Sequence, residues 1–310
     1  MSDLSIALIG CGALGQVHLT VWMNLIGVRV RAVIDKNASL AVQTVAPYVG
    51  IPVFPDLQTA LESGAFDLVD ICLPPQEQAP VIEEALLAGC NVMCDKPITY
   101  TANTAYPLVQ LANQRERHLL PGFAHRFYAP LLHLKECIDN DDIGRPTMFR
   151  CRFSGHWEEA SADRTGDILT ETATNGIDLF RYLCGEVASS HGYTRKIDVN
   201  LGVPDTALVT LESVTGTLGV VEACWTSPGG HNRVEVYGSA GAAIVDYDSE
   251  TLRILTAEHP VWQTRYESGP NRYERLLSHC TDVVRGLQEP TLTAQDALRT
   301  LEICASISKA

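Results

Sequence analysis

The segment "LSIALIGCGALGQVHLTVWMNL" near the N-terminus constrains the fold more than any other stretch of this chain. Gly10, Gly12 and Gly15 form a G-x-G-x-x-G motif between an apolar strand pattern and a helix pattern. The first glycine permits a tight turn, the second lets the backbone approach a pyrophosphate, and the third allows close helix–strand packing. The expected helix begins near Ala13 and Leu14, where free amides and the positive end of the helix dipole would face phosphates. The segment therefore predicts a dinucleotide-binding βα unit.

The next strand pattern, "VRVRAVID", ends in Asp35, 20 residues after Gly15. An acidic residue there suits the two hydroxyls of an adenine ribose and repels a 2′-phosphate. Lys36 follows at once and weakens that preference, because a cation would attract the phosphate. We expect NAD as the cofactor, with NADP left open.

The strand and helix patterns continue to alternate through "IPVF", "DLQTALES", "FDLVDICLPP", "APVIEEALLAGC" and "NVMCDKP". Units of this length predict a parallel, doubly wound sheet. Ligands bind at the carboxyl ends of the strands in such sheets. Besides the glycine turn and Asp35, two strand ends therefore contribute candidate cofactor-binding residues, which are Leu73, Pro74, Asp95, Lys96 and Pro97.

After about residue 122 the pattern changes to one helix followed by consecutive strands. The helix is "APLLHLKECIDN", and the strands include "TMFRCRFSGHW", "DTALVTLES", "TGTLGVVEACW", "HNRVEVYGSA" and "AAIVDYD". Consecutive strands with turn signals between them predict an antiparallel sheet. The expected architecture is a Rossmann domain over residues 1–122 and an α+β domain with a large open sheet over residues 123–310.

Composition excludes several partners. The net charge of −14 argues against nucleic acid, because phosphate binding needs a basic surface. No apolar run is long enough to span a bilayer, and the N-terminus lacks the basic region of a secretory signal. The ten cysteines have no metal-ligand spacing and fit small buried apolar residues in a reducing compartment. We expect a cytoplasmic protein without a metal.

The motif order resembles the glucose–fructose oxidoreductase and inositol dehydrogenase (Gfo/Idh/MocA) superfamily over nearly the whole chain. The resemblance rests on the glycine turn, Asp35, "ICLPP", "EEALLAGCNVMCDKPIT", "PGFAHRF", "IGRPTMFRCRF", "ETATNGIDLFRYLCGE", "VEVYGSAGAAIVD" and "TAQDALRTLEICASISKA". Its most specific element is "CDKPIT", which is similar to a Glu-Lys-Pro signature with Asp95 one methylene shorter. The resemblance implies that Lys96 reaches the substrate and the nicotinamide, and that the bond before Pro97 is often cis.

One helix departs from the family. Glu171, Asn175, Asp178 and Tyr182 share a helix face through their spacing. The family carries an acid at the position of Glu171, an aspartate at that of Asp178, and a proton-transferring histidine where this chain has Asn175. An amide cannot act as a general base near neutral pH. Three alternatives remain: Lys96 transfers the proton alone, another side chain substitutes, or the dehydrogenase chemistry is lost.

The substitutes considered are His156, His125 and Glu171. A second, smaller departure is Gln78, which stands where many members have histidine. Arg126 resembles a substrate-contacting position, and pairing with an acidic neighbour is its alternative role.

These features predict a nicotinamide-dependent oxidoreductase acting on a secondary alcohol or ketone of a polyol, cyclitol or sugar. Lys96, Asn175 and Glu171 are the expected catalytic residues, and Arg126, His156 and Asp178 are expected to bind substrate. The alternatives are a non-catalytic cofactor- or sugar-responsive regulator and an oxidation–elimination–reduction cycle. The resemblance also implies a homodimer or homotetramer formed through the second domain's sheet, whose exposed face would otherwise favour aggregation.

Overall fold

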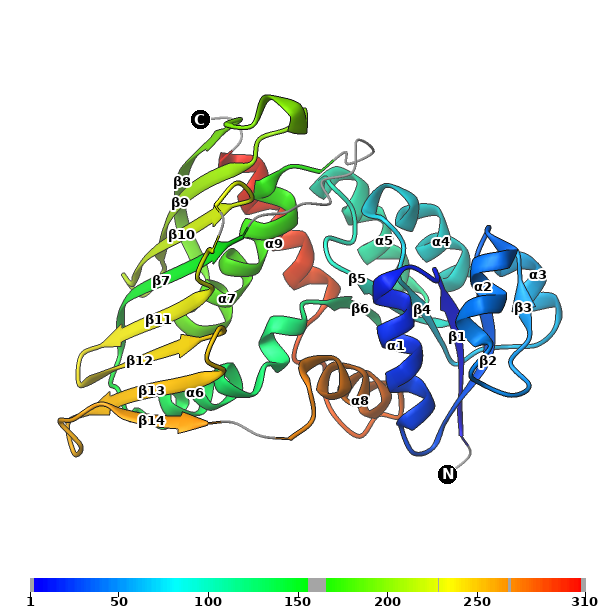
Figure 1. Ribbon diagram of the computed structural model, residues 1–310, viewed down its shortest axis with the longest axis horizontal. Coiled ribbons are helices and arrows are strands. Elements are labelled where there is room, and N and C mark those ends of the chain that lie inside the picture. The colour runs from blue at the N-terminus through cyan, green and yellow to red at the C-terminus, as the bar shows by residue number, and fades with distance from the viewer. Residues whose placement is uncertain (1–2, 156–165, 228, 267–268, 308–310) are drawn as a thin grey trace. The chain divides into compact units, whose positions relative to one another are not determined.

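The computed structural model describes residues 3–155, 166–227, 229–266 and 269–307, and the chain packs as two units (Figure 1). Unit 1 contains residues 1–123 and 272–299, and unit 2 contains residues 124–271 and 300–310. Among the described residues, no helix is both long and apolar enough to cross a membrane.

Unit 1 is built on a six-stranded parallel sheet with strand order β3-β2-β1-β4-β5-β6. This is the strand order of a dinucleotide-binding Rossmann domain. The strands are β1 (Leu4–Ile9), β2 (Val28–Ile34), β3 (Val53–Phe54), β4 (Leu68–Ile71), β5 (Asn91–Asp95) and β6 (Leu119–Gly122). The connecting helices are α1 (Ala13–Asn24), α2 (Ala38–Val45), α3 (Leu57–Glu62), α4 (Pro75–Leu87) and α5 (Ala102–Gln114).

Side chains at the helix starts explain where two of these helices begin. Asn37 caps α2 by accepting a hydrogen bond from the Leu40 amide at 3.1 Å, and Asp56 caps α3 through the Thr59 amide at 2.8 Å. Such caps satisfy amides that have no partner inside the helix.

Helix α8 (Arg272–Val284) belongs to unit 1, although the expected division placed it in the second domain. Its buried residues include Leu277 and Cys280, and the Cys280 sulfur lies 3.8 Å from that of Met93 in β5. Just after the helix, Arg285 donates a hydrogen bond of 2.6 Å to the Gly27 carbonyl. The chain therefore returns to the first unit to cover its core. The last helix, α9 (Ala294–Ile307), contributes residues to both units.

Unit 2 contains an eight-stranded sheet with strand order β14-β13-β12-β11-β7-β10-β9-β8. Its strands are β7 (Pro146–Ser154), β8 (Val187–Arg195), β9 (Thr206–Ser213), β10 (Leu218–Cys224), β11 (Arg233–Gly238), β12 (Gly241–Asp246), β13 (Thr251–Thr256) and β14 (Gln263–Tyr266). The pairing is antiparallel as expected, except that β7 and β10 run parallel.

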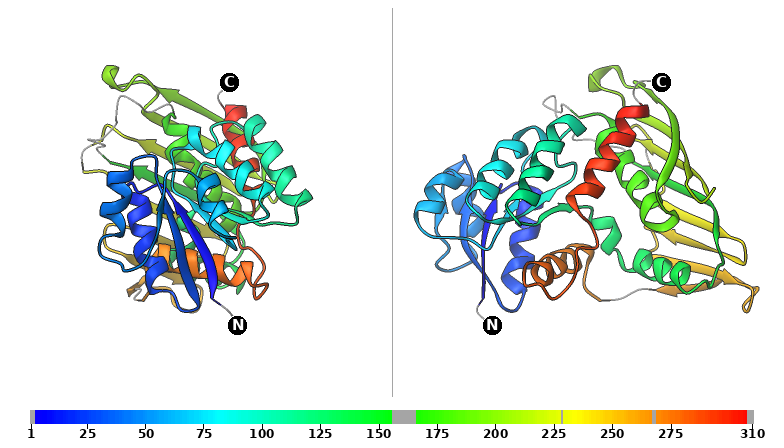
Figure 2. Two further views of the ribbon diagram at one scale, coloured as in Figure 1. Left: turned by 90° about the vertical axis from the view of Figure 1, so that its right-hand side faces the viewer. Right: turned by 180° about the vertical axis from the view of Figure 1, so that it is seen from behind.

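Helices α6 (Ala129–Asp139) and α7 (Thr174–Cys184) lie on the same face of this sheet (Figures 1 and 2). The short elements of the unit are η1 (Ala124–Phe127), the π-turn η2 (Leu169–Ala173) and η3 (Val199–Leu201). A Cβ at Gly176 in α7 would lie 2.5 Å from Val221 of β10, so only glycine allows α7 to sit this close. Gly176 therefore allows α7 to pack closely against the sheet.

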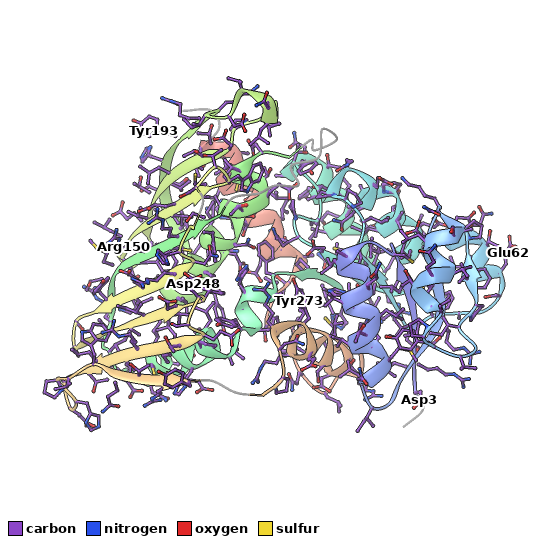
Figure 3. All side chains as sticks on the ribbon, viewed as in Figure 1. Asp3, Glu62, Arg150, Tyr193, Asp248 and Tyr273 are labelled. Atoms are coloured by element: carbon purple, nitrogen blue, oxygen red, sulfur yellow. The ribbon has the colours of Figure 1, made fainter. Side chains whose placement is uncertain are left out.

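The outward face of the unit 2 sheet carries alternating exposed side chains, while the intervening residues form the core. Figure 3 shows Arg150 and Tyr193 pointing away from the helices. No helix of unit 2 covers this face in the part of the chain that the structure describes (Figure 2).

Candidate cofactor and substrate residues

The glycine turn between β1 and α1 has the shape that a pyrophosphate site requires. Gly10 has φ of +95°, and a Cβ there would lie 2.4 Å from the Cys72 carbonyl oxygen. A Cβ on Gly15 would lie 1.8 Å from the Gly10 oxygen, so both positions need glycine. A Cβ on Gly12, in contrast, would meet no atom within 4 Å. The space at Gly12 is open to a ligand, and the residues of the turn therefore fit a dinucleotide.

The start of α1 continues this site. Gly12 precedes the helix without a capping side chain, and Ala13 is exposed while Leu14 is half-buried. The first amides of a helix have no partner within it, so they are available to phosphate oxygens. Leu73 lies close by, because its Cδ2 would be 3.2 Å from a Cβ on Gly10, and Pro74 immediately precedes α4.

Asp35 faces the glycine turn from the end of β2. Its Oδ2 accepts a hydrogen bond of 2.8 Å from the Cys11 amide, and its Oδ1 accepts one of 2.8 Å from the Asn37 amide. Lys36 instead pairs with Glu77, with 2.8 Å between its Nζ and Oε2. The structure thus brings Asp35 to the glycine turn and directs Lys36 to α4.

Lys96 follows Asp95 at the end of β5, and its bond to Pro97 is cis. The buried Gln78 of α4 supports this turn: its Nε2 donates to the Asp95 carbonyl at 3.1 Å and to the Pro97 carbonyl at 3.3 Å. Two carbonyls that flank Lys96 are therefore held by one side chain. Sequence reasoning noted Gln78 only as a departure from the family and missed this support.

One group of described residues has ligand atoms close enough for a metal ion: His18, Asp70 and Cys72, all within 4.8 Å of one another. Hydrogen bonds account for the proximity of these side chains. Asp70 Oδ2 accepts from Trp22 Nε1 at 2.6 Å and lies 2.9 Å from His18 Nδ1. Burial raises the pKa of the Cys72 thiol well above its ordinary value, so the thiolate that would bind a metal is disfavoured. All ten cysteines are free; eight are buried as the sequence predicted, while Cys72 and Cys224 are half-buried.

The helix expected near residues 171–186 is present in unit 2, with a π-turn at its start. Glu171 is half-buried in η2, and the helix ends at Gly185, which has φ of +92°. Trp225 braces η2 by donating to Thr172 Oγ1 at 2.8 Å. Single π-turns inside helices occur frequently at functional sites.

The polar face of α7 does not face solvent. Asn175 is 7% exposed, and its Oδ1 is buried without a hydrogen-bond partner among the described residues. A buried polar atom without a partner is uncommon and costs free energy. A hydroxyl donor from a ligand would remove this cost, which fits a substrate contact.

Arg126 and Asp178 bind each other. Arg126 Nε and Nη2 donate to the two carboxylate oxygens of Asp178 at 2.8 and 2.7 Å, and both residues are buried. The pair is bidentate, which is the strongest geometry for such an interaction. The acidic neighbour considered for Arg126 is thus Asp178. His156, the third expected substrate contact, lies outside the described residues.

The strand order of unit 1 and its glycine turn define a dinucleotide-binding protein with a second, sheet-based domain. The family model described as "Oxidoreductase family, NAD-binding Rossmann fold" matches residues 4–123, and the model of the GFO/IDH/MocA C-terminal domain matches residues 131–244. The chain belongs to the Gfo/Idh/MocA oxidoreductase family, and the predicted NAD cofactor is the one that this family domain binds.

Two curated relatives align over almost their whole length. The scyllo-inositol 2-dehydrogenase (NAD(+)) of Bacillus subtilis is 28% identical, covering 96% of this chain and 91% of the relative. An inositol 2-dehydrogenase of Mycolicibacterium gilvum is 29% identical, covering 99% of this chain and 90% of the relative. A levoglucosan dehydrogenase solved with NADH and L-sorbose superposes with a TM-score of 0.89 at 19% identity, over all of this chain and 96% of that one. That likeness shows the shared fold.

Proposed function

We propose that this protein is an NAD-dependent dehydrogenase that oxidises a secondary alcohol of a polyol, cyclitol or sugar, or reduces the corresponding ketone. The observation that carries the proposal is the position of Lys96, which lies in a turn whose two flanking carbonyls accept hydrogen bonds from Gln78. The same unit has a glycine turn that fits a dinucleotide. The names of the inositol dehydrogenase relatives favour the same substrate class.

Lys96 would take the hydroxyl proton during oxidation and return it during reduction. The chemistry that a bound nicotinamide would supply is hydride transfer to or from the carbon that bears this hydroxyl. Asn175 Oδ1, which has no described donor, would accept a substrate hydroxyl, and Glu171 would bind or orient another. Polar groups that hydrogen-bond a hydroxyl discriminate strongly against analogues that lack it.

The other expected substrate contacts have different support. Arg126 and Asp178 are hydrogen-bonded to each other. They would therefore contribute to substrate binding by positioning α7, or through further hydrogen bonds of their own. A role for His156 rests on the family resemblance alone.

The test is a panel of polyols and sugars offered with NAD and NADP, with reduced nicotinamide followed by its absorbance. Lys96→Ala should lower kcat at least about 100-fold, the scale of general acid–base catalysis. Lys196→Ala, which removes an exposed lysine, is the matched control. Turnover that survives Lys96→Ala would exclude the proton-transfer role.

A regulatory protein is the second candidate, favoured by the amide at position 175. Asn175→His separates the two functions. An inactive wild type that gains turnover with this change supports the regulator. An active wild type that loses turnover supports Asn175 as a substrate contact.

We also propose that the protein forms a homodimer or homotetramer through the outward face of the unit 2 sheet. This face carries exposed Tyr193, Leu208 and Leu218 beside charged residues of both signs. Exposed apolar side chains on an uncovered sheet face are typical of an interaction surface.

A further inference from the structure

The Lys36–Glu77 ion pair joins the end of β2 to the first turn of α4. The Lys36 Nζ and Glu77 Oε2 atoms are 2.8 Å apart, and the two side chains are 81% and 40% exposed. An exposed pair of this kind contributes little to folding stability. Its position next to Asp35 suggests another role.

Asp35 is fixed in place, because both of its carboxylate oxygens accept backbone amides. A carboxylate at this strand end suits ribose hydroxyls and repels a 2′-phosphate. Lys36 is the next residue, and a cation beside this strand end would attract the same phosphate. The two residues therefore oppose each other in cofactor selection, and the partner of Lys36 influences the balance.

We propose that Glu77 is a specificity-determining residue that favours NAD over NADP by pairing with Lys36. This inference rests on the proposed use of a nicotinamide dinucleotide. The Glu77 carboxylate draws the Lys36 ammonium toward α4 and cancels its charge at short range. It also adds a second negative charge near Asp35, which disfavours a 2′-phosphate further. Removing the Glu77 charge would leave Lys36 available to that phosphate.

The experiment measures equilibrium binding of NADH and NADPH to the full chain by fluorescence titration, so its readout does not depend on turnover. In Glu77→Gln, the ratio of the NADPH Kd to the NADH Kd should fall about tenfold relative to wild type. This fall in the Kd ratio should be smaller in ~1 M salt, where the Debye length is about 3 Å. Glu83→Gln removes the same charge from an exposed position of α4 and should leave the ratio within about twofold.

The double variant Glu77→Gln/Lys36→Ala tests the mechanism, because without Lys36 the ratio should return to the wild-type value or rise above it. An unchanged Kd ratio in Glu77→Gln would overturn the role of Glu77. A lowered Kd ratio that persists in the double variant would overturn it too. Failure of the wild type to bind either reduced cofactor would overturn the proposed function as well. NADH binding with an unchanged ratio would overturn this inference alone.

Discussion

Gln78 shows how one buried side chain can support the turn that carries the proposed catalytic lysine, Lys96. The Gln78 amide nitrogen donates to the carbonyls of Asp95 and Pro97, on either side of Lys96. Gln78 is fully buried, and its hydrogen bond to the Pro97 carbonyl is buried, while the bond to the Asp95 carbonyl is part-buried. Buried carbonyls that lose their donors cost free energy and tend to find new partners.

Gln78→Leu keeps much of the volume of the side chain and removes both donors. We expect kcat to fall about 10- to 100-fold with little change in KM, because a displacement of about 1 Å can cost 100-fold in rate. Steady-state kinetics on the best substrate of the panel measures both constants.

Gln78→His retains a ring N–H donor and should recover part of kcat, which a merely structural role would not require. Gln58→Leu, at an exposed position of α3, is the control. A Gln78→Leu enzyme with unchanged kcat would show that the turn does not need this support.

At the scale of elements, the Arg126–Asp178 pair joins η1 to α7. Removing one partner of a buried pair costs about 3–5 kcal/mol, because the remaining charged group loses its bidentate hydrogen bonds. Asp178→Leu should therefore lower the free energy of unfolding by about that amount, and Arg126→Met/Asp178→Leu should lower it less. Urea unfolding of the single and double variants measures the difference.

Among the described residues, Glu222 forms exposed ion pairs with Arg152 and Arg150 at 3.8 and 3.9 Å, so Glu222→Gln should change stability by less than about 1 kcal/mol. If the double variant is as unstable as Asp178→Leu alone, the pair does not hold α7 in the way inferred here.

The local patterns of the sequence predicted the elements well, because the information lies in adjacent residues. The glycine turn specified β1 and α1, and the spacing of Glu171, Asn175 and Asp178 indicated the helix that contains α7. Contacts between residues that are far apart in the sequence could not be predicted from these local patterns. Gln78 reaches a carbonyl 19 residues away, Glu77 and Lys36 are 41 residues apart, and the Arg126–Asp178 pairing spans 52 residues. These contacts depend on strand order and register, which local spacing does not encode.

The second unit departs from its expected boundary for a related reason. Residues 272–299 follow the last strand of the unit 2 sheet in sequence, so local pattern assigned them to the second domain. Their packing depends on apolar surface that the first unit leaves open, and α8 buries Leu276 and Val283 there. A chain that returns to an earlier domain leaves no local signal of doing so. The predicted residues 1–122 remain together in unit 1.

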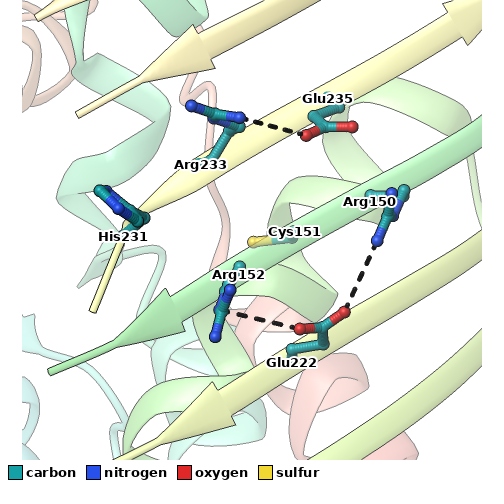
Figure 4. Close-up of a pocket in the computed structure, with 7 residues that line it drawn as sticks. All are labelled: Arg150, Cys151, Arg152, Glu222, His231, Arg233 and Glu235. Carbon is teal, nitrogen blue, oxygen red and sulfur yellow. Dashed lines mark ion pairs between the residues drawn. The ribbon is translucent and has the colours of Figure 1, made fainter. Parts of the chain in front are cut away.

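At the scale of the whole molecule, the outward face of the unit 2 sheet combines apolar and charged residues. Cross-strand register aligns Tyr193, Leu208, Glu222 and Arg152 in one row across four strands. Beside Glu222, a hollow of about 250 Å³ is lined by residues that include Arg150, Arg152, Arg233 and Glu235 (Figure 4). Carboxylates and guanidinium groups on one face allow two copies to pair opposite charges about a two-fold axis.

Leu208→Glu/Leu218→Glu places two charges on this face, at residues that are 45% and 53% exposed. If the face joins two copies, burying these carboxylates would be costly, and the dimer Kd should rise at least about 100-fold. Size-exclusion chromatography with light scattering, over a range of protein concentrations, measures the mass. Val49→Glu changes a fully exposed residue of unit 1 and should leave the mass unchanged. A monomeric wild type at micromolar concentration, or an oligomer unaffected by the double variant, would reject this face as the interface.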